Sequence, residues 1–93
     1  MYTDLIHYKL APHISERDFL ELTLKVRKSW LEHQSGFIEW TQHRNAKGGF
    51  TDIVTWASKG DAKAAEKNMA RNPHDKQWGA CYTDVTAEHL ESL

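Results

Sequence analysis

The chain has 93 residues, 12 basic and 13 acidic side chains, and a formal net charge of −1. This length suits one small domain, and a charge so close to zero provides no general attraction to nucleic acid or to an anionic membrane, so neither is expected as a partner. Cys81 is the single cysteine, which excludes an intramolecular disulfide. Because no apolar run is long enough to span a bilayer and no signal peptide is recognisable, we expect a cytoplasmic protein.

The first predicted element is a strand over residues 2–10, YTDLIHYKL. It ends before Pro12, because proline has no amide hydrogen to donate to a sheet. Leu5 and His7 lie on one side of this strand, opposite a second bulky set, so both faces carry large groups. The second set consists of Tyr2, Ile6, Tyr8 and Leu10. We therefore expect a strand that is buried on two faces.

A first helix is predicted after Ser15, which can cap it. Glu16 and Asp18 lie in the first turn, where negative charge meets the positive end of the helix dipole. Apolar residues then recur at steps of three and four, which predicts a helix lying on a sheet. They are Phe19, Leu22, Val26 and Trp30, with Leu20, Leu24 and Leu31 widening the stripe.

A β-hairpin is predicted after this helix. Gly36 should end the helix, since glycine readily adopts the left-handed conformation that satisfies the last carbonyl groups. Residues 37–44 and 50–57 both mix aromatic and β-branched side chains with polar ones, and the short Gly-rich loop 45–49 joins them. This arrangement is typical of two antiparallel strands.

A second helix is expected over about residues 61–71, where alanine is frequent, with Ser58 or Asp61 as its cap. It should break at Asn72-Pro73, because proline disfavours helical backbone in the residue before it. Asn72 would then cap a short turn at 74–81, followed by a last strand at 83–90.

The element order is therefore strand, helix, strand, strand, helix, strand. It predicts an α+β, ferredoxin-like βαββαβ fold, with a four-stranded antiparallel sheet and two main helices on one face. The strands carry more apolar residues than two helices can cover, which favours dimerisation through the sheet. These residues are Ile6, Tyr8, Ile38, Trp40, Ile53 and Val54.

Several segments resemble the antibiotic biosynthesis monooxygenase-like family of dimeric α/β barrel proteins. They are Tyr8–Pro12, Phe19-Leu20, Gly36–Ile38, Asp52–Ser58 and Asp61-Ala62. The resemblance covers nearly the whole chain, as a single domain over residues 1–93. It implies a homodimer in which two sheets face each other, with a cavity between sheet and helices in each subunit. These motifs mark architecture and leave the activity open.

The same resemblance implies a reaction class. In the cofactor-independent monooxygenases of this family the protein supplies a dry cavity with aromatic walls, and the electron-rich substrate itself reduces oxygen. We therefore expect an oxidoreductase of this kind, acting on an aromatic, quinol or polyketide-like molecule. Two alternatives stay open: a non-catalytic protein that binds or senses a small molecule on the same scaffold, and a lyase or isomerase that uses a histidine base.

The site should lie on the helix-facing side of the strands. His7 is the first candidate catalytic residue, since a neutral imidazole among apolar neighbours can accept a proton near neutral pH. His74 is the second, and Trp78, four residues later, would share its face of the short turn and roof the cavity. The other predicted substrate-binding residues are Trp56, Tyr82 and Met69. Each has an ordinary structural alternative, because buried tryptophans and core histidines more often pack than react.

No cofactor and no metal are expected. Haem-degrading relatives use a polar first-strand residue, a tryptophan in the second helix and a histidine near the end of that helix. Here His7 and Ala65 depart from that pattern and only His74 matches, so a haem held by His74 is the remaining alternative. The six histidines show no His-x-His or His-x-x-x-His spacing, and a single cysteine leaves no Cys-x-x-Cys pair.

Overall fold

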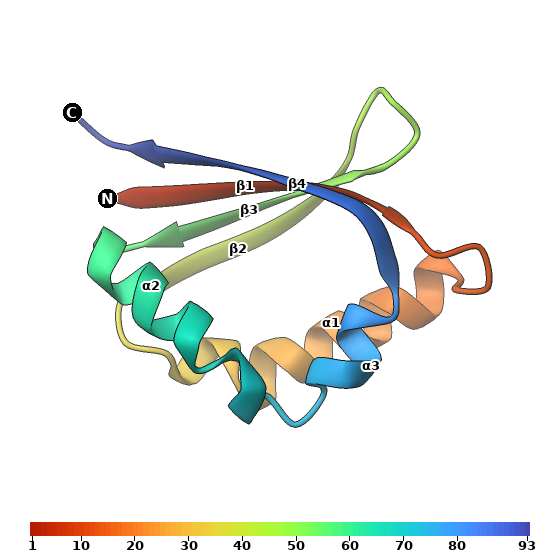
Figure 1. Ribbon diagram of the computed structural model, residues 1–93, viewed down its shortest axis with the longest axis horizontal. Coiled ribbons are helices and arrows are strands. Elements are labelled where there is room, and N and C mark those ends of the chain that lie inside the picture. The colour runs from red at the N-terminus through yellow and green to blue at the C-terminus, as the bar shows by residue number, and fades with distance from the viewer.

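A computed structural model of residues 1–93 shows one sheet with all helices beneath one of its faces (Figure 1). The sheet has four antiparallel strands in the order β2-β3-β1-β4, so the predicted ferredoxin-like fold is confirmed. The strands are β1 (Tyr2–Leu10), β2 (Phe37–Arg44), β3 (Phe50–Trp56) and β4 (Tyr82–Glu91). The helices are α1 (Glu16–Ser29), α2 (Lys59–Lys67) and α3 (Asp75–Gly79), with 3₁₀ turns at Leu31–His33 and Met69–Arg71.

The first helix begins as predicted and ends earlier. Ser15 Oγ accepts a hydrogen bond from the backbone N–H of Asp18 at 3.1 Å, which caps α1. The α-helix stops at Ser29, and a 3₁₀ turn connects it to Gly36, whose φ of 76° is left-handed. Glycine therefore ends the connection rather than the helix. Leu20 and Leu24 were expected to widen the buried stripe, but both are exposed, because that flank of α1 points away from the sheet.

The second helix is capped by Ser58, which settles the choice between the two predicted caps. Ser58 Oγ accepts from the backbone N–H of Asp61 at 3.1 Å. After the turn that follows α2, Asn72 Oδ1 accepts from the backbone N–H of His74 at 3.0 Å and fixes the entry into α3. No helix is both long and apolar enough to cross a membrane.

The core lies between the sheet and the helices. Phe19, Leu22 and Val26 of α1 are buried against the strands, as their spacing predicted. Helix-facing strand residues form the other side of the core, and they alternate with residues that point to the outside of the sheet. The buried members on the strands are Tyr2, Tyr8, Trp40, Val54 and Trp56.

A single chain covers most of the apolar strand residues that were expected to favour dimerisation. Tyr8, Trp40 and Val54 are buried within one chain, and Ile6 packs against them. Ile53 is half-buried and Ile38 is exposed. Most of the apolar strand residues therefore share the helix side, where a single chain covers them.

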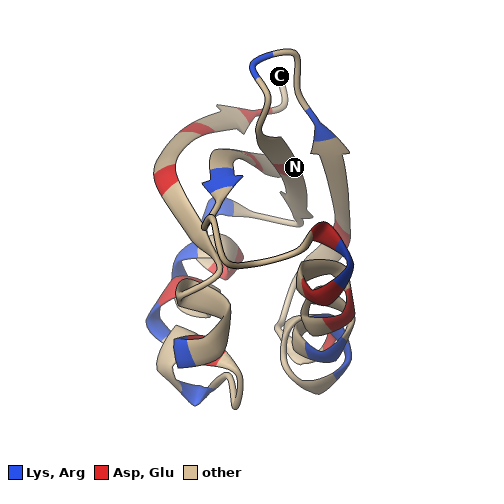
Figure 2. Ribbon diagram, turned by 90° about the vertical axis from the view of Figure 1, so that its right-hand side faces the viewer, with Lys and Arg blue, Asp and Glu red and all other residues tan.

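The opposite face of the sheet, called here the outer face, carries no helix (Figure 1). The strand register places a mixed set of side chains on it, with threonines alternating with a few apolar and charged groups. Its members are Thr3, Leu5, His7, Glu39, Thr41, His43, Thr51, Ile53, Thr55, Thr86, Glu88 and Leu90. On the helix side, acidic and basic residues are interspersed along the helices (Figure 2).

Candidate functional site

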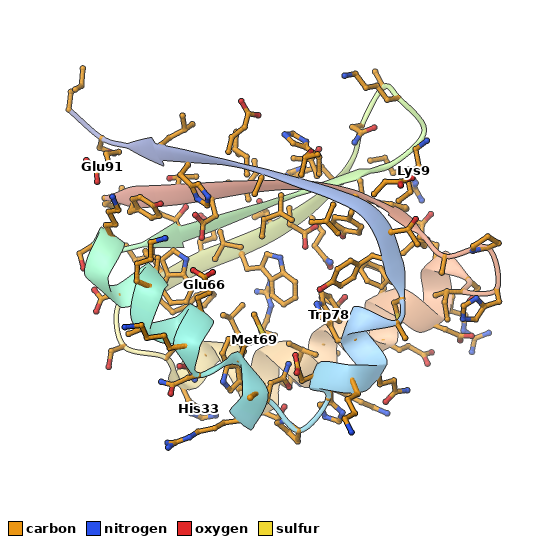
Figure 3. All side chains as sticks on the ribbon, viewed as in Figure 1. Lys9, His33, Glu66, Met69, Trp78 and Glu91 are labelled. Atoms are coloured by element: carbon orange, nitrogen blue, oxygen red, sulfur yellow. The ribbon has the colours of Figure 1, made fainter.

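A cavity of about 400 Å³ lies between the sheet and the helices. Its walls are mainly aromatic: all four tryptophans and all three tyrosines of the chain line it. They are Tyr2, Tyr8, Trp30, Trp40, Trp56, Trp78 and Tyr82. Figure 3 shows Glu66, Met69 and Trp78 on the helix side of this space. Such a cavity suits a planar aromatic ligand, because offset-stacked and edge-on ring contacts both become available.

Trp78 is the centre of the aromatic wall. Its ring stacks on Phe19 with the ring centroids 4.9 Å apart, and its edge meets Trp40 at 5.5 Å. Tyr82 approaches it at 6.0 Å from the start of β4. The short helix α3 thus delivers one large side chain that connects α1 to two strands.

A buried polar cluster interrupts this wall. Asp52 is a carboxyl group on the buried face of β3, which also carries Val54 and Trp56, and it is only 4 % exposed. Tyr8 Oη donates to its Oδ1 at 2.7 Å, and Trp40 Nε1 donates to its Oδ2 at 3.0 Å. Both carboxyl oxygens therefore have donors, which a carboxyl group needs when it is removed from water.

Burial changes the protonation of this cluster. It raises the pKa of Asp52 above the ordinary value of 3.8, because the charged form loses its hydration, and the bonds from Tyr8 and Trp40 oppose that rise only in part. The pKa of Tyr8 is also raised, first by burial and then by the neighbouring Asp52 carboxylate. Burial likewise raises the pKa of Tyr82. Both tyrosines thus stay neutral, and Tyr8 donates its hydroxyl hydrogen to Asp52.

Side chains from β2 and α1 hold the cluster in place. Gln42 Nε2 lies 3.5 Å from Tyr8 Oη and 3.3 Å from Thr23 Oγ1 of α1. Arg27, also on α1, lies over the Trp40 ring at 5.3 Å and donates to the Trp40 carbonyl oxygen. The polar cluster is therefore fixed by helix-to-sheet contacts as well as by the sheet itself.

A second polar pair lies elsewhere on the same cavity wall. Asp4 of β1 and His89 of β4 are directly opposite in the strand register, and both line the cavity. His89 Nδ1 is 2.6 Å from Asp4 Oδ1, and the His89 ring stacks on Tyr2 with the ring centroids 5.9 Å apart. The imidazole is 52 % exposed and the carboxylate 19 %, so the pair marks an open edge of the cavity.

Three buried donors on residues that line the cavity have no hydrogen-bond partner. They are Trp30 Nε1, Trp56 Nε1 and Asn72 Nδ2. A buried donor without an acceptor costs about 1–3 kcal/mol, so such groups are rare in a finished core. These three donors therefore lie unpaired in the wall of the cavity.

The structure brings four predicted site residues together and leaves two outside. Trp56, Met69, Trp78 and Tyr82 all line the cavity, as expected. His7 and His74 do not.

The predicted placement of His7 beside the cavity was wrong. Its Nδ1 is 2.9 Å from Thr51 Oγ1 and its Nε2 is 3.0 Å from Glu88 Oε2, both on the outer face. Strand alternation explains the error: the larger neighbours Ile6 and Tyr8 take the helix side, so the residue between them points away.

His74 precedes the first turn of α3, and its side chain is not part of the cavity lining. A haem held by His74 therefore does not fit this cavity. No group of three or more His, Cys, Asp or Glu side chains is arranged to hold a metal ion.

Sequence reasoning missed Asp52, Tyr8 and Trp40 as site residues, as well as the pair of Asp4 and His89. One signal for Asp52 was available, since a carboxylate alternates there with apolar residues on the buried side of a strand. No comparable local signal existed for the pair, whose members are 85 residues apart.

Comparisons with known proteins identify the fold. No protein-family model and no curated protein sequence matches the chain. Among solved structures, SnoaB, a cofactor-independent oxygenase from Streptomyces nogalater, superposes with a TM-score of 0.80 at 16% identity, over 99% of this chain and 92% of that one. A monooxygenase from the gene ActVA-Orf6 of Streptomyces coelicolor, in complex with nanaomycin D, gives 0.76 at 12% identity, over 99% and 87%. The haem-degrader MhuD from Mycobacterium tuberculosis, with two haems in its active site, gives 0.74 at 14% identity, over 100% and 96%. The chain therefore has the fold of the antibiotic biosynthesis monooxygenase-like proteins, as its sequence resemblance predicted.

Proposed function

We propose that this protein is a cofactor-independent monooxygenase that oxidises a hydroxylated aromatic compound, such as a quinol or a polyketide-like phenol. One observation carries the proposal: Asp52, bonded to Tyr8 and Trp40, is buried inside a cavity lined by every tryptophan and tyrosine of the chain. The shared fold with SnoaB, a cofactor-independent oxygenase, and with the nanaomycin D complex supports this reaction class.

The reaction needs no external electrons. A phenol and O₂ give a quinone and water. One ring C–H bond, the phenolic O–H bond and the O–O bond are broken; one oxygen atom forms the new C=O group, and the other leaves as water with the two hydrogens. The substrate supplies all the electrons, so the protein has to bind the ring, exclude water and stabilise the anion that reacts with oxygen. The aromatic walls bind the ring, while the Asp52 cluster is the polar group beside its oxygen substituents.

The proposal includes a homodimer formed through the outer face. No helix covers this face, and Leu5, Ile53 and Leu90 lie on neighbouring strands within it. Pairing two copies through it leaves the cavity, on the other side of the sheet, within each subunit.

Oxygen consumption with a panel of quinols and hydroxylated naphthalenes tests the reaction. We expect oxygen uptake without added metal or cofactor. In an atmosphere of ¹⁸O₂, mass spectrometry should find one ¹⁸O atom incorporated into each product molecule. Asp52→Asn should lower kcat/KM by roughly 10- to 100-fold, because an amide cannot accept from both Tyr8 and Trp40. His33→Gln is the matched control, since His33 is exposed in the 3₁₀ turn Leu31–His33 and bonds only to the Lys28 carbonyl oxygen.

The same assay on His7→Gln tests the candidate that the sequence favoured. We expect little change, because this side chain faces away from the cavity. Ligands that quench the tryptophan fluorescence without oxygen uptake would instead indicate a binding or sensing protein. Product formation under anaerobic conditions would indicate a lyase or isomerase.

A further inference from the structure

We propose that Asp4 and His89 are the proton acceptor of the cavity, with His89 Nε2 removing the hydroxyl proton of a phenolic ligand. The proposed function supplies the identity of that ligand, and this inference assigns the group that ionises it.

The geometry fixes which imidazole nitrogen is available. A carboxylate only accepts hydrogen bonds, so the 2.6 Å contact makes Nδ1–H of His89 the donor to Asp4 Oδ1. The lone pair of the neutral ring is then on Nε2, and no protein group bonds to that atom. The stacked Tyr2 ring restrains the plane of the imidazole. A histidine oriented by a carboxylate in this way is prepared to accept a proton.

The other candidate groups are less suited to this role. His89 is the only histidine that lines the cavity. Both oxygens of Asp52 already accept hydrogen bonds from Tyr8 and Trp40. The position of His89 at the open edge also lets an accepted proton pass to solvent, which Asp52, at 4 % exposure, cannot do directly.

Charged groups from α2 and β4 also lie at the end of the cavity that holds Asp4 and His89. Lys63 and Glu66 of α2 both line the cavity and lie 3.9 Å from each other, so their charges largely offset. Glu91 of β4 lies near the Tyr2 ring together with Glu66 and Asp4. Acidic groups therefore outnumber basic ones at this end of the cavity.

The step is a simple proton transfer. The O–H bond of the phenol breaks, its electron pair stays on oxygen, and a new N–H bond forms at Nε2. The imidazolium then lies between the Asp4 carboxylate and the phenolate, so its positive charge has a negative group on each side. A phenolate gives electrons to oxygen more readily than a phenol, which connects this step to the proposed oxidation.

A probe that does not react with oxygen tests the pair independently of turnover. 4-Nitrophenol absorbs in the visible range only as its phenolate, so difference spectra at neutral pH with excess protein report the ratio of bound phenolate to bound phenol. We expect the protein to raise this ratio relative to buffer. His89→Gln should lower it by roughly tenfold, because the group that takes up the proton is lost. Asp4→Asn should lower it as well, because the imidazolium then lacks the carboxylate that stabilises it.

His33→Gln is the matched control, because His33 is exposed in the 3₁₀ turn after α1 and bonds only to the Lys28 carbonyl oxygen. It should leave the ratio unchanged. Circular dichroism confirms that each variant is folded before its spectrum is interpreted. Equal ratios in wild type, His89→Gln and Asp4→Asn would overturn the proposal.

Turnover separates this inference from the proposed function. With an active substrate, His89→Gln should lower kcat/KM by roughly 100-fold. Asp4→Asn should lower it less, because the imidazole is still present and only the carboxylate that orients it is lost. Asp4→Glu should restore part of the loss, because it returns a carboxylate to this position. A protein that ionises the probe but consumes no oxygen would refute the monooxygenase and support the proton acceptor. Oxygen uptake that is unaffected in His89→Gln would support the monooxygenase and refute the proton acceptor.

Discussion

Asp52 is a carboxyl group in a position that strand alternation assigns to the apolar side of the sheet. Hydrogen bonds from Tyr8 and Trp40 satisfy it, but burial still raises its pKa above 3.8. The folded state therefore binds the Asp52 proton more tightly than the unfolded state does. The stability that this group contributes is fully present below about pH 3.8 and is lost as the pH rises through the higher folded value.

Asp52→Asn should remove this pH dependence. The difference in unfolding free energy between variant and wild type is expected to shift in favour of the variant from pH 4 to pH 7, because only the wild type has to ionise a buried carboxyl group. Urea unfolding at several pH values measures it. Parallel curves for the two proteins would show that Asp52 does not titrate differently in the folded state.

Gly36, just before β2, brings the chain close to the start of α2. Gly36 has a left-handed φ of 76°, and a Cβ atom there would overlap the side chain of Asp61 in the first turn of α2. Asp61 is in turn bonded to the capping Ser58, and the Gly36 carbonyl oxygen accepts from Ala57 at 2.7 Å. This close approach aligns the start of β2 with the start of α2.

Gly36→Ala should lower the unfolding free energy by more than Gly48→Ala. Both glycines have similar positive φ values, 76° and 79°, so both substitutions incur the left-handed penalty of about 1–2 kcal/mol. Only at Gly36 does the new methyl group meet Asp61, whereas nothing lies near Gly48. We expect an additional loss of about 1–3 kcal/mol at Gly36, measured by chemical denaturation. Equal losses at the two sites would show that the Asp61 contact is unimportant.

The whole molecule presents one uncovered sheet face, and the proposed dimer uses it. Ile53→Lys, near the middle of the outer face, should convert the dimer to a monomer, because a charge would be buried in the interface. Leu20→Lys is the control, since Leu20 is an exposed leucine on α1, away from the sheet. Native mass spectrometry reads both states and also weighs any bound small molecule. A monomeric wild type would refute the dimer.

Local chemistry was enough to predict most of the fold. The strands at 2–10 and 37–44 have the predicted bounds, Ser15 caps the first helix, and Asn72-Pro73 ends the second helical region. These features depend on caps, turns and periodicity over a few residues, so the amino-acid sequence determines them directly. For the same reason Trp56, Met69, Trp78 and Tyr82 were placed correctly around the cavity.

The chemistry of the site was decided by the tertiary structure. A period of two shows that Tyr8 and His7 point to opposite sides of β1, but it does not show which side the helices cover. Packing settled that, because burying Tyr2, Ile6 and Tyr8 removes more apolar surface from water than burying Leu5 and His7. The pairing of Asp4 with His89 depends on the register between the first and last strands, a contact between the two ends of the chain that no local pattern encodes.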